Sequence, residues 1–138
     1  IRLSLVGSEM CIRDRAEAKY PVYAAHMRSL HQRHVDTVGK AVDAGVPVYA
    51  GTDAGGTIAH GQISTEIRLL SQLRDPLFGL GAASWRARSW LTGDQEAAGL
   101  GVGAAADLLV LDADPRRDVT AIAYPTFVVL RGRVLRDR

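Results

Sequence analysis

The chain has 138 residues, 47% of them hydrophobic, and a formal net charge of +2. This length suits one domain or a piece of one. Charges of both signs are interspersed, and no apolar run approaches the roughly 20 residues that span a bilayer, so neither a nucleic-acid partner nor membrane contact is expected.

The cysteine content predicts the compartment. Cys11 is the single cysteine, so an internal disulfide is excluded and a reducing environment is favoured. Usage rich in Ala, Gly, Val and Arg is typical of a GC-rich bacterial genome. We therefore expect a bacterial, cytoplasmic protein.

Residues 1–15 read IRLSLVGSEMCIRDR and do not resemble a signal peptide, because charged residues stand where a cleavage site would lie. Leu5 to Asp14 matches, residue for residue, the in-frame translation of a transposon-type sequencing-library adapter. We expect 1–15 to be a non-native leader whose Leu5, Val6 and Ile12 pack poorly on the rest. The alternative is a genuine strand followed by a loop.

The next elements are predicted to be a helix and a strand. Between Val22 and Ala44, apolar residues recur at helical spacing, which predicts one long amphipathic helix. Pro21 suits its first turn, and Gly45 suits the position just past its end. Val46 to Ala50 then predicts a short, buried strand of a parallel sheet.

Two further helices are expected after a glycine-rich loop at 51–61. One is predicted over 62–73, with its apolar face formed by Ile63, Ile67 and Leu70. The second begins with Asp75 as N-cap and Pro76 at the first helical position, and ends near Gly93. Its inward residues are expected to be Leu77, Leu80, Ala83, Ala87 and Leu91.

The remainder is predicted to be β structure. Ala106 to Leu111 is strand-like, Asp112 to Pro115 reads as a turn, and two strands, 127–130 and 133–135, form a hairpin around Arg131-Gly132. The expected division is 16–98 for an α/β part and 99–138 for a β part. The fold class predicted is therefore α/β.

One group of residues is suited to chemistry. Asp53 lies within Gly51-Thr52-Asp53-Ala54-Gly55-Gly56, directly after the predicted strand. Groups at the carboxyl ends of parallel strands face the ligand crevice, and glycines let a ligand approach the backbone. A metal ligand or a general base would suit this position, and a loop cap is the alternative.

Several motifs together resemble the amidohydrolase superfamily, in particular its imidazolonepropionase-like and prolidase-like branches. They are AVDAGVPVYAGTDAGG, HGQISTEIRLL, DPLFGLGAASWRARSWL, GVGAAADLLVLDADPRRDV and FVVLRGRVL, in that order between about Val35 and Leu135. The resemblance implies the last part of a (β/α)8 barrel of the TIM type, followed by strands of a small β-sandwich. Arg86 departs from the pattern, because relatives often have Asn there.

The resemblance also implies an activity for a longer parent protein. That activity is hydrolysis of an amide, cyclic amide or peptide bond of a small molecule by a metal-activated water, with zinc as the expected divalent ion. Asp53 falls where the family keeps the aspartate that approaches the metal and takes the proton from its bound water. The other metal ligands lie on segments that this chain lacks, so we expect the fragment alone to be inactive. A homo-oligomer of the full-length parent stays open.

The histidines and serines contribute little by comparison. His60 follows Asp53 in the same loop and is the candidate substrate-binding residue. His26, His31 and His34 are expected to be solvent-exposed helix residues. Ser64 and Ser84 have no neighbouring triad partners. Trp85 and Trp90 are interpreted as packing residues.

An alternative from another class remains: a stand-alone, non-enzymatic α/β domain that has no catalytic site. A genuine upstream start codon would favour it, and sequencing reads that extend the frame beyond the adapter would exclude it.

Overall fold

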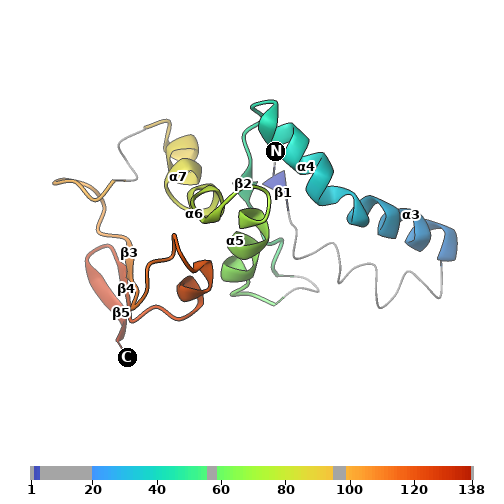
Figure 1. Ribbon diagram of the computed structural model, residues 1–138. Coiled ribbons are helices and arrows are strands. Elements are labelled where there is room, and N and C mark those ends of the chain that lie inside the picture. Colours follow the sequence, from blue (N-terminus) through green and yellow to red (C-terminus); the bar gives the residue numbers. More distant parts are fainter. Residues whose placement is uncertain (1, 4–19, 56–58, 95–98, 138) are drawn as a thin grey trace.

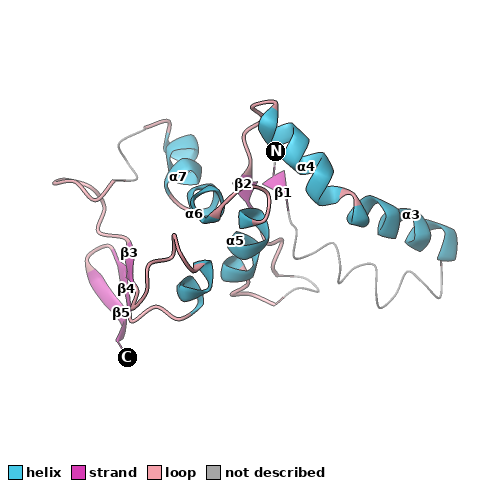
Figure 2. Cartoon of the chain, in the orientation of Figure 1, coloured by secondary structure: helices cyan, strands magenta, loops and turns pink. Residues whose placement is uncertain are grey.

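The computed structural model describes residues 2–3, 20–55, 59–94 and 99–137. It confirms an α/β chain of helices with a small antiparallel sheet (Figures 1 and 2). In Figure 1, β2 lies near the centre, with α4 on one side and α5 to α7 on the other, and the three-stranded sheet at the C-terminal end. Leu5, Val6 and Ile12 lie outside the described residues.

The single long helix predicted between Val22 and Ala44 is divided into two helices, so the prediction of one continuous helix is wrong. α3 spans Pro21–Gln32 and α4 spans His34–Asp43, with Arg33 between them. Two carbonyls near this break bond to side chains, because Arg33 Nε donates to Ser29 O and His34 Nδ1 lies against His31 O. Such side-chain bonds compete with the helical ladder, which explains why periodicity alone did not locate the break.

The first helix begins and the second helix ends at the residues that the sequence predicted. Pro21 occupies the first turn of α3. After α4, the amide of Gly45 donates to Val42 O and that of Val46 donates to Ala41 O, while Gly45 has a φ of 82°. This is a Schellman ending, which favours glycine because the left-handed conformation carries no Cβ penalty. The predicted stop of the helix at Gly45 is confirmed.

The predicted strand is shorter than expected but parallel. β2 spans Tyr49–Ala50 and pairs in parallel with β1, Arg2–Leu3. Val48, just before β2, is 2% exposed and joins Val38, Val42, Leu70 and Ala82 in the core, so one face of this segment is covered by helices.

α5 spans Ile63–Ser71, and it contributes buried Ile67 and Leu70 as predicted. Ile63, which was expected on the same face, is instead 47% exposed. It is the first residue of the helix.

The second predicted helix is also divided, at Ser84, into α6, Pro76–Ala83, and α7, Trp85–Thr92. Asp75 caps α6 as expected, because its Oδ1 accepts from the amide of Phe78 at 2.8 Å. Ser84 leaves helical geometry with φ −132° and ψ −101°. The bend changes the direction of α7, on which Leu91 is 75% exposed, and Leu77 in the first turn of α6 is 51% exposed. The prediction that these two residues face inward is therefore wrong.

α5 and α6 approach each other closely at Gly79. A Cβ built on Gly79 would lie 2.3 Å from Ser71 Oγ and 2.4 Å from Ile67 O. Both distances are below any ordinary contact, and the second atom is backbone, which cannot rotate away. The glycine is therefore required by packing and not by its own φ.

We expect Gly79→Ala to lower the free energy of unfolding by about 1–3 kcal/mol or more, because the added methyl group overpacks the α5–α6 contact. Gly39→Ala is the matched control. A Cβ on Gly39, within α4, would meet nothing within 4 Å, so alanine there is expected to stabilise by about 1 kcal/mol through helix propensity. Urea denaturation followed by circular dichroism measures both. Equal effects of the same sign would contradict the packing argument.

The C-terminal sheet has the order β3-β4-β5, with β3 at Leu108–Val110, β4 at Phe127–Leu130 and β5 at Arg133–Asp137. All neighbours are antiparallel. The turn residues Arg131 and Gly132 have φ of 49° and 74°, the pair of left-handed residues that a type I′ hairpin requires. The predicted hairpin is confirmed.

A short 3₁₀ helix, η2 at Val119–Ala123, was not predicted and is capped by Asp118.

Asp107 links α7 to this sheet. Its carboxylate accepts from the amide of Arg131 at 2.7 Å and from Arg88 Nη1 of α7 at 3.2 Å. The amide of Arg131, together with the nearby Arg88 guanidinium, lowers the pKa of Asp107 below its ordinary value of 3.8. A carboxylate whose folded pKa is depressed stabilises the fold above its unfolded pKa and loses that contribution as the pH falls through the folded value.

We therefore expect the urea midpoint to fall as the pH is lowered below about 4, where Asp107 of the unfolded chain takes up a proton while the folded chain still keeps the carboxylate ionised. Asp107→Asn removes this ionisation, so its midpoint is lower than that of the unchanged chain at pH 7, and the difference shrinks as the pH falls through the folded pKa of Asp107. A constant difference between the two midpoints from pH 7 to pH 2 would show that Asp107 does not act through its charge.

Among the residues that the structure describes, no helix combines the length and the apolar character that crossing a bilayer requires.

Candidate active site

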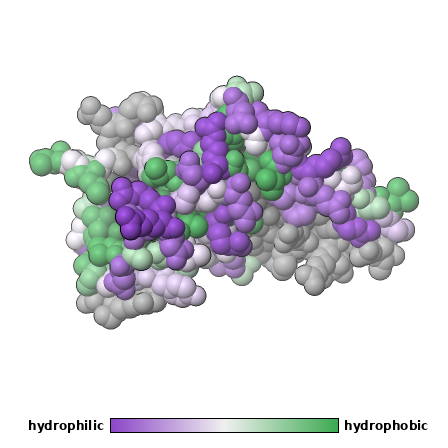
Figure 3. Space-filling model, in the orientation of Figure 1, coloured by the Kyte–Doolittle hydropathy of each residue, from purple (hydrophilic) through white to green (hydrophobic). Residues whose placement is uncertain are grey.

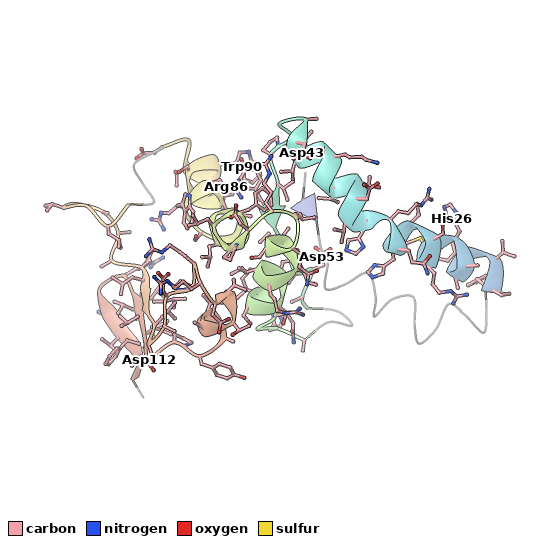
Figure 4. The ribbon with its side chains drawn as sticks, viewed as in Figure 1. His26, Asp43, Asp53, Arg86, Trp90 and Asp112 are labelled. Atoms are coloured by element: carbon pink, nitrogen blue, oxygen red, sulfur yellow. The ribbon has the colours of Figure 1, made fainter. Side chains whose placement is uncertain are left out.

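Asp53 lies three residues after β2, in the loop that leads to α5 (Figure 4). Its side chain is exposed, and its backbone adopts the left-handed conformation with φ 50°. Apart from Arg131, it is the only non-glycine residue of the described chain with a positive φ. Residues held in such conformations are often found at functional sites, and aspartate tolerates the conformation better than most residues.

The residues around Asp53 define a tight turn. Gly51 is buried next to the end of β2, and the amide of Ala54 donates to Thr52 Oγ1 at 3.4 Å. Gly55 has a φ of 115°, a conformation that side chains rarely adopt. The turn therefore directs the chain away from the strand and leaves the Asp53 carboxylate at its outer side.

His60 returns to this turn. A Cβ built on Gly55 would lie 3.6 Å from His60 Cε1 and 3.7 Å from His60 Nε2, so the imidazole packs beside Gly55, two residues after Asp53. His60 is exposed. The structure thus places the two residues that the sequence indicated, a carboxylate and an imidazole, in one loop at the carboxyl end of β2.

The donor set does not hold a metal ion by itself. A catalytic zinc usually needs three protein ligands, and the described part of the chain contains no group of three His, Cys, Asp or Glu residues in reach of one ion. The described residues therefore do not fit the metal that the resemblance implies. What they offer is a proton acceptor at Asp53 and a hydrogen-bonding group at His60.

The other histidines differ from expectation. His31 and His34 stack on each other, with ring centroids 4.5 Å apart and planes at 22°. Both are partly buried, so the prediction that they are simply solvent-exposed is wrong, whereas His26 is exposed as predicted.

Arg86, the residue that departs from the pattern of the resemblance, joins α6 to α7. Its Nη2 donates to Phe78 O at 2.6 Å, and its guanidinium lies 4.5 Å from the centroid of the Phe78 ring. The hydrogen bond and the cation–π contact give this residue a packing role. Glu66 of α5 is fully buried. The sequence did not indicate this, because the predicted apolar face of the helix consisted of Ile63, Ile67 and Leu70.

No family model matches the chain. An uncharacterized protein of Mycobacterium bovis is 48% identical over 119 residues, which are 86% of this chain and 31% of that protein. A counterpart from Mycobacterium tuberculosis matches equally well. The chain thus spans about a third of the curated relatives that it matches.

The chain also corresponds to about a third of several solved structures. A crystal structure of an uncharacterized protein has a TM-score of 0.78 at 26% identity, covering 99% of this chain and 35% of that one. A prolidase complexed with N-methylphosphonate-L-proline also scores 0.78, at 24% identity and the same coverage. An ochratoxinase from A. niger has a TM-score of 0.76 at 21% identity, and the match covers 99% of this chain and 32% of that one. The chain therefore shares its fold with about a third of each of these solved chains, among which are a prolidase and an ochratoxinase.

Proposed function

We propose that this chain is the C-terminal part of a metal-dependent hydrolase that cleaves an amide, cyclic amide or peptide C–N bond in a small molecule, with Asp53 as its general base. The observation that carries the proposal is the position of Asp53: exposed, left-handed, and at the carboxyl end of a parallel strand. The structural neighbours support the reaction class, because prolidases and dipeptidases are peptidases by name.

In the proposed reaction, water adds to the carbonyl carbon and the C–N bond breaks. The Asp53 carboxylate accepts a proton from the attacking water, and that proton is then available to the departing amine. His60, packed beside Gly55, is proposed to contact the substrate. In the intact parent a divalent metal, with zinc expected, would supply Lewis-acid chemistry at this water, and residues outside the described part of this chain would be needed to hold it.

The fold of the parent is part of the proposal. β2 and the helices that follow it would form the last portion of a (β/α)8 barrel, in which catalytic residues lie at the carboxyl ends of the strands. β3, β4 and β5 would belong to a small β-sandwich. Apolar side chains on the sheet support this, since Leu109, Leu130 and Val134 are all about half exposed. Figure 3 shows hydrophobic surface at this end of the molecule.

A full-length chimera tests the proposal. In it, the 119 residues of this chain that match the Mycobacterium bovis relative replace their counterparts in that protein. We expect it to hydrolyse at least one class among Xaa-Pro dipeptides, N-acyl amino acids and cyclic amides, and to lose that activity with a chelator. A folded, metal-loaded chimera that cleaves phosphate esters but none of these C–N substrates would contradict the proposal.

A further inference from the structure

The turn that carries Asp53 (Figure 4) continues into Gly55, whose φ of 115° lies beyond the left-handed helical region. Glycine reaches such angles readily because it has no Cβ, whereas any L side chain there is strained. Asp53, with a φ of 50°, stays within the range that aspartate tolerates. The backbone therefore requires glycine at position 55 but not at position 53.

The imidazole of His60 lies against this glycine. The position that a Cβ of Gly55 would take is 3.6 Å from His60 Cε1 and 3.7 Å from His60 Nε2. In the described part of the chain, apart from the sequence neighbours of Gly55, no other atom lies within 4 Å of that position. Because the His60 side chain is otherwise exposed, the Gly55 backbone is a surface on which one edge of its ring rests.

The turn around Asp53 has a contact of its own. Thr52 Oγ1 accepts from the amide of Ala54 at 3.4 Å, and β2 ends three residues before Asp53. These features lie on the N-terminal side of Gly55 and do not involve His60. A change at Gly55 is therefore expected to move the imidazole more than the Asp53 carboxylate.

An exposed imidazole has several rotamers, and ordering such a side chain when a ligand binds costs free energy. A ring that already rests on the Gly55 backbone has lost part of that freedom before the substrate arrives. We propose that Gly55 is a positioning residue, whose backbone conformation seats the His60 imidazole beside the Asp53 turn and thereby lowers the KM of the parent enzyme. The inference rests on the proposed function, because it takes His60 as the residue that contacts the substrate.

A double-mutant cycle in the full-length chimera tests whether Gly55 acts through His60. Gly55→Ala is expected to raise KM by about the same factor as His60→Ala, with kcat within about threefold of the unchanged value. In the double variant, KM should rise no further, because the ring that Gly55 positions is absent. An unchanged KM for Gly55→Ala would overturn the proposal, as would two factors that multiply in the double variant.

Gly103→Ala is the matched control for backbone strain. Gly103 has a φ of 91°, and a Cβ there would meet nothing within 4 Å. Alanine at either glycine should lower the melting temperature, because both positions disfavour a side chain. Only Gly55→Ala should raise KM, and Gly103→Ala should leave it within about twofold. Equal increases in KM for the two variants would assign the effect to general destabilisation and overturn the proposal.

Nuclear magnetic resonance separates this inference from the proposed function. With an isotope label at histidine Cε1, the His60 signal of the chimera is identified by its loss in His60→Ala. We expect a nuclear Overhauser effect between His60 Hε1 and Gly55 Hα. We also expect the His60 signal to move in Gly55→Ala but not in Gly103→Ala.

Both results in a chimera that cleaves no C–N substrate would uphold the seat of His60 on Gly55 and reject only the proposed function. A chimera that is active but lacks the Overhauser effect would overturn the inference and leave the proposed function in place. If Gly55→Ala does not fold, Gly55→Asn replaces it in every comparison, because asparagine tolerates a positive φ better than alanine.

Discussion

Asp53→Asn in the full-length chimera is expected to lower kcat by about a hundredfold to ten-thousandfold, the usual effect of removing one general base. The amide has nearly the same size as the carboxylate but cannot accept the proton of the attacking water. Asparagine also tolerates the left-handed φ of 50° at this position, so the turn is expected to keep its shape. Steady-state kinetics on the best C–N substrate measures the effect.

His60→Ala is the comparison variant for this experiment. If His60 contacts the substrate, its removal raises KM while kcat changes by less than about threefold. The melting temperatures of both variants should stay close to that of the unchanged chimera, because both side chains are exposed. A kcat for Asp53→Asn within about threefold of the unchanged value would make Asp53 a structural residue and the site assignment wrong.

The 138-residue chain on its own is expected to show no metal-dependent hydrolysis. One carboxylate cannot hold a catalytic zinc that needs about three protein ligands, and the described residues contain no such group. Equilibrium dialysis should therefore find no stoichiometric, tightly bound zinc on the isolated chain, and turnover of the substrates that the chimera cleaves should stay at the background rate.

The chimera, at the same protein and zinc concentrations, is the positive control. Reproducible turnover by the isolated chain that is abolished by a chelator and by Asp53→Asn would overturn the expectation. It would mean that ligands are recruited from residues that the sequence did not single out, or from a second copy of the chain.

The sequence alone determined the features that depend on nearest neighbours. Asp75 and Pro76 predict the start of α6, since the capping carboxylate and the fixed φ act within one turn. Gly45 predicts the end of α4 in the same way. Asp53 was singled out from its position after a β-branched apolar run, and in the structure it lies three residues after β2.

Only the tertiary structure decided how these elements contact one another. The breaks at Arg33 and Ser84 depend on side chains that bond to carbonyls three or four residues away, which hydrophobic periodicity does not register. The breaks rotate the apolar faces, so the expected inward position of Leu91 was wrong. The stacking of Tyr49 on Trp90, 41 residues apart by their numbers, likewise has no local signal. Local capping is encoded by adjacent residues, whereas long-range packing depends on the geometry that all the elements reach together.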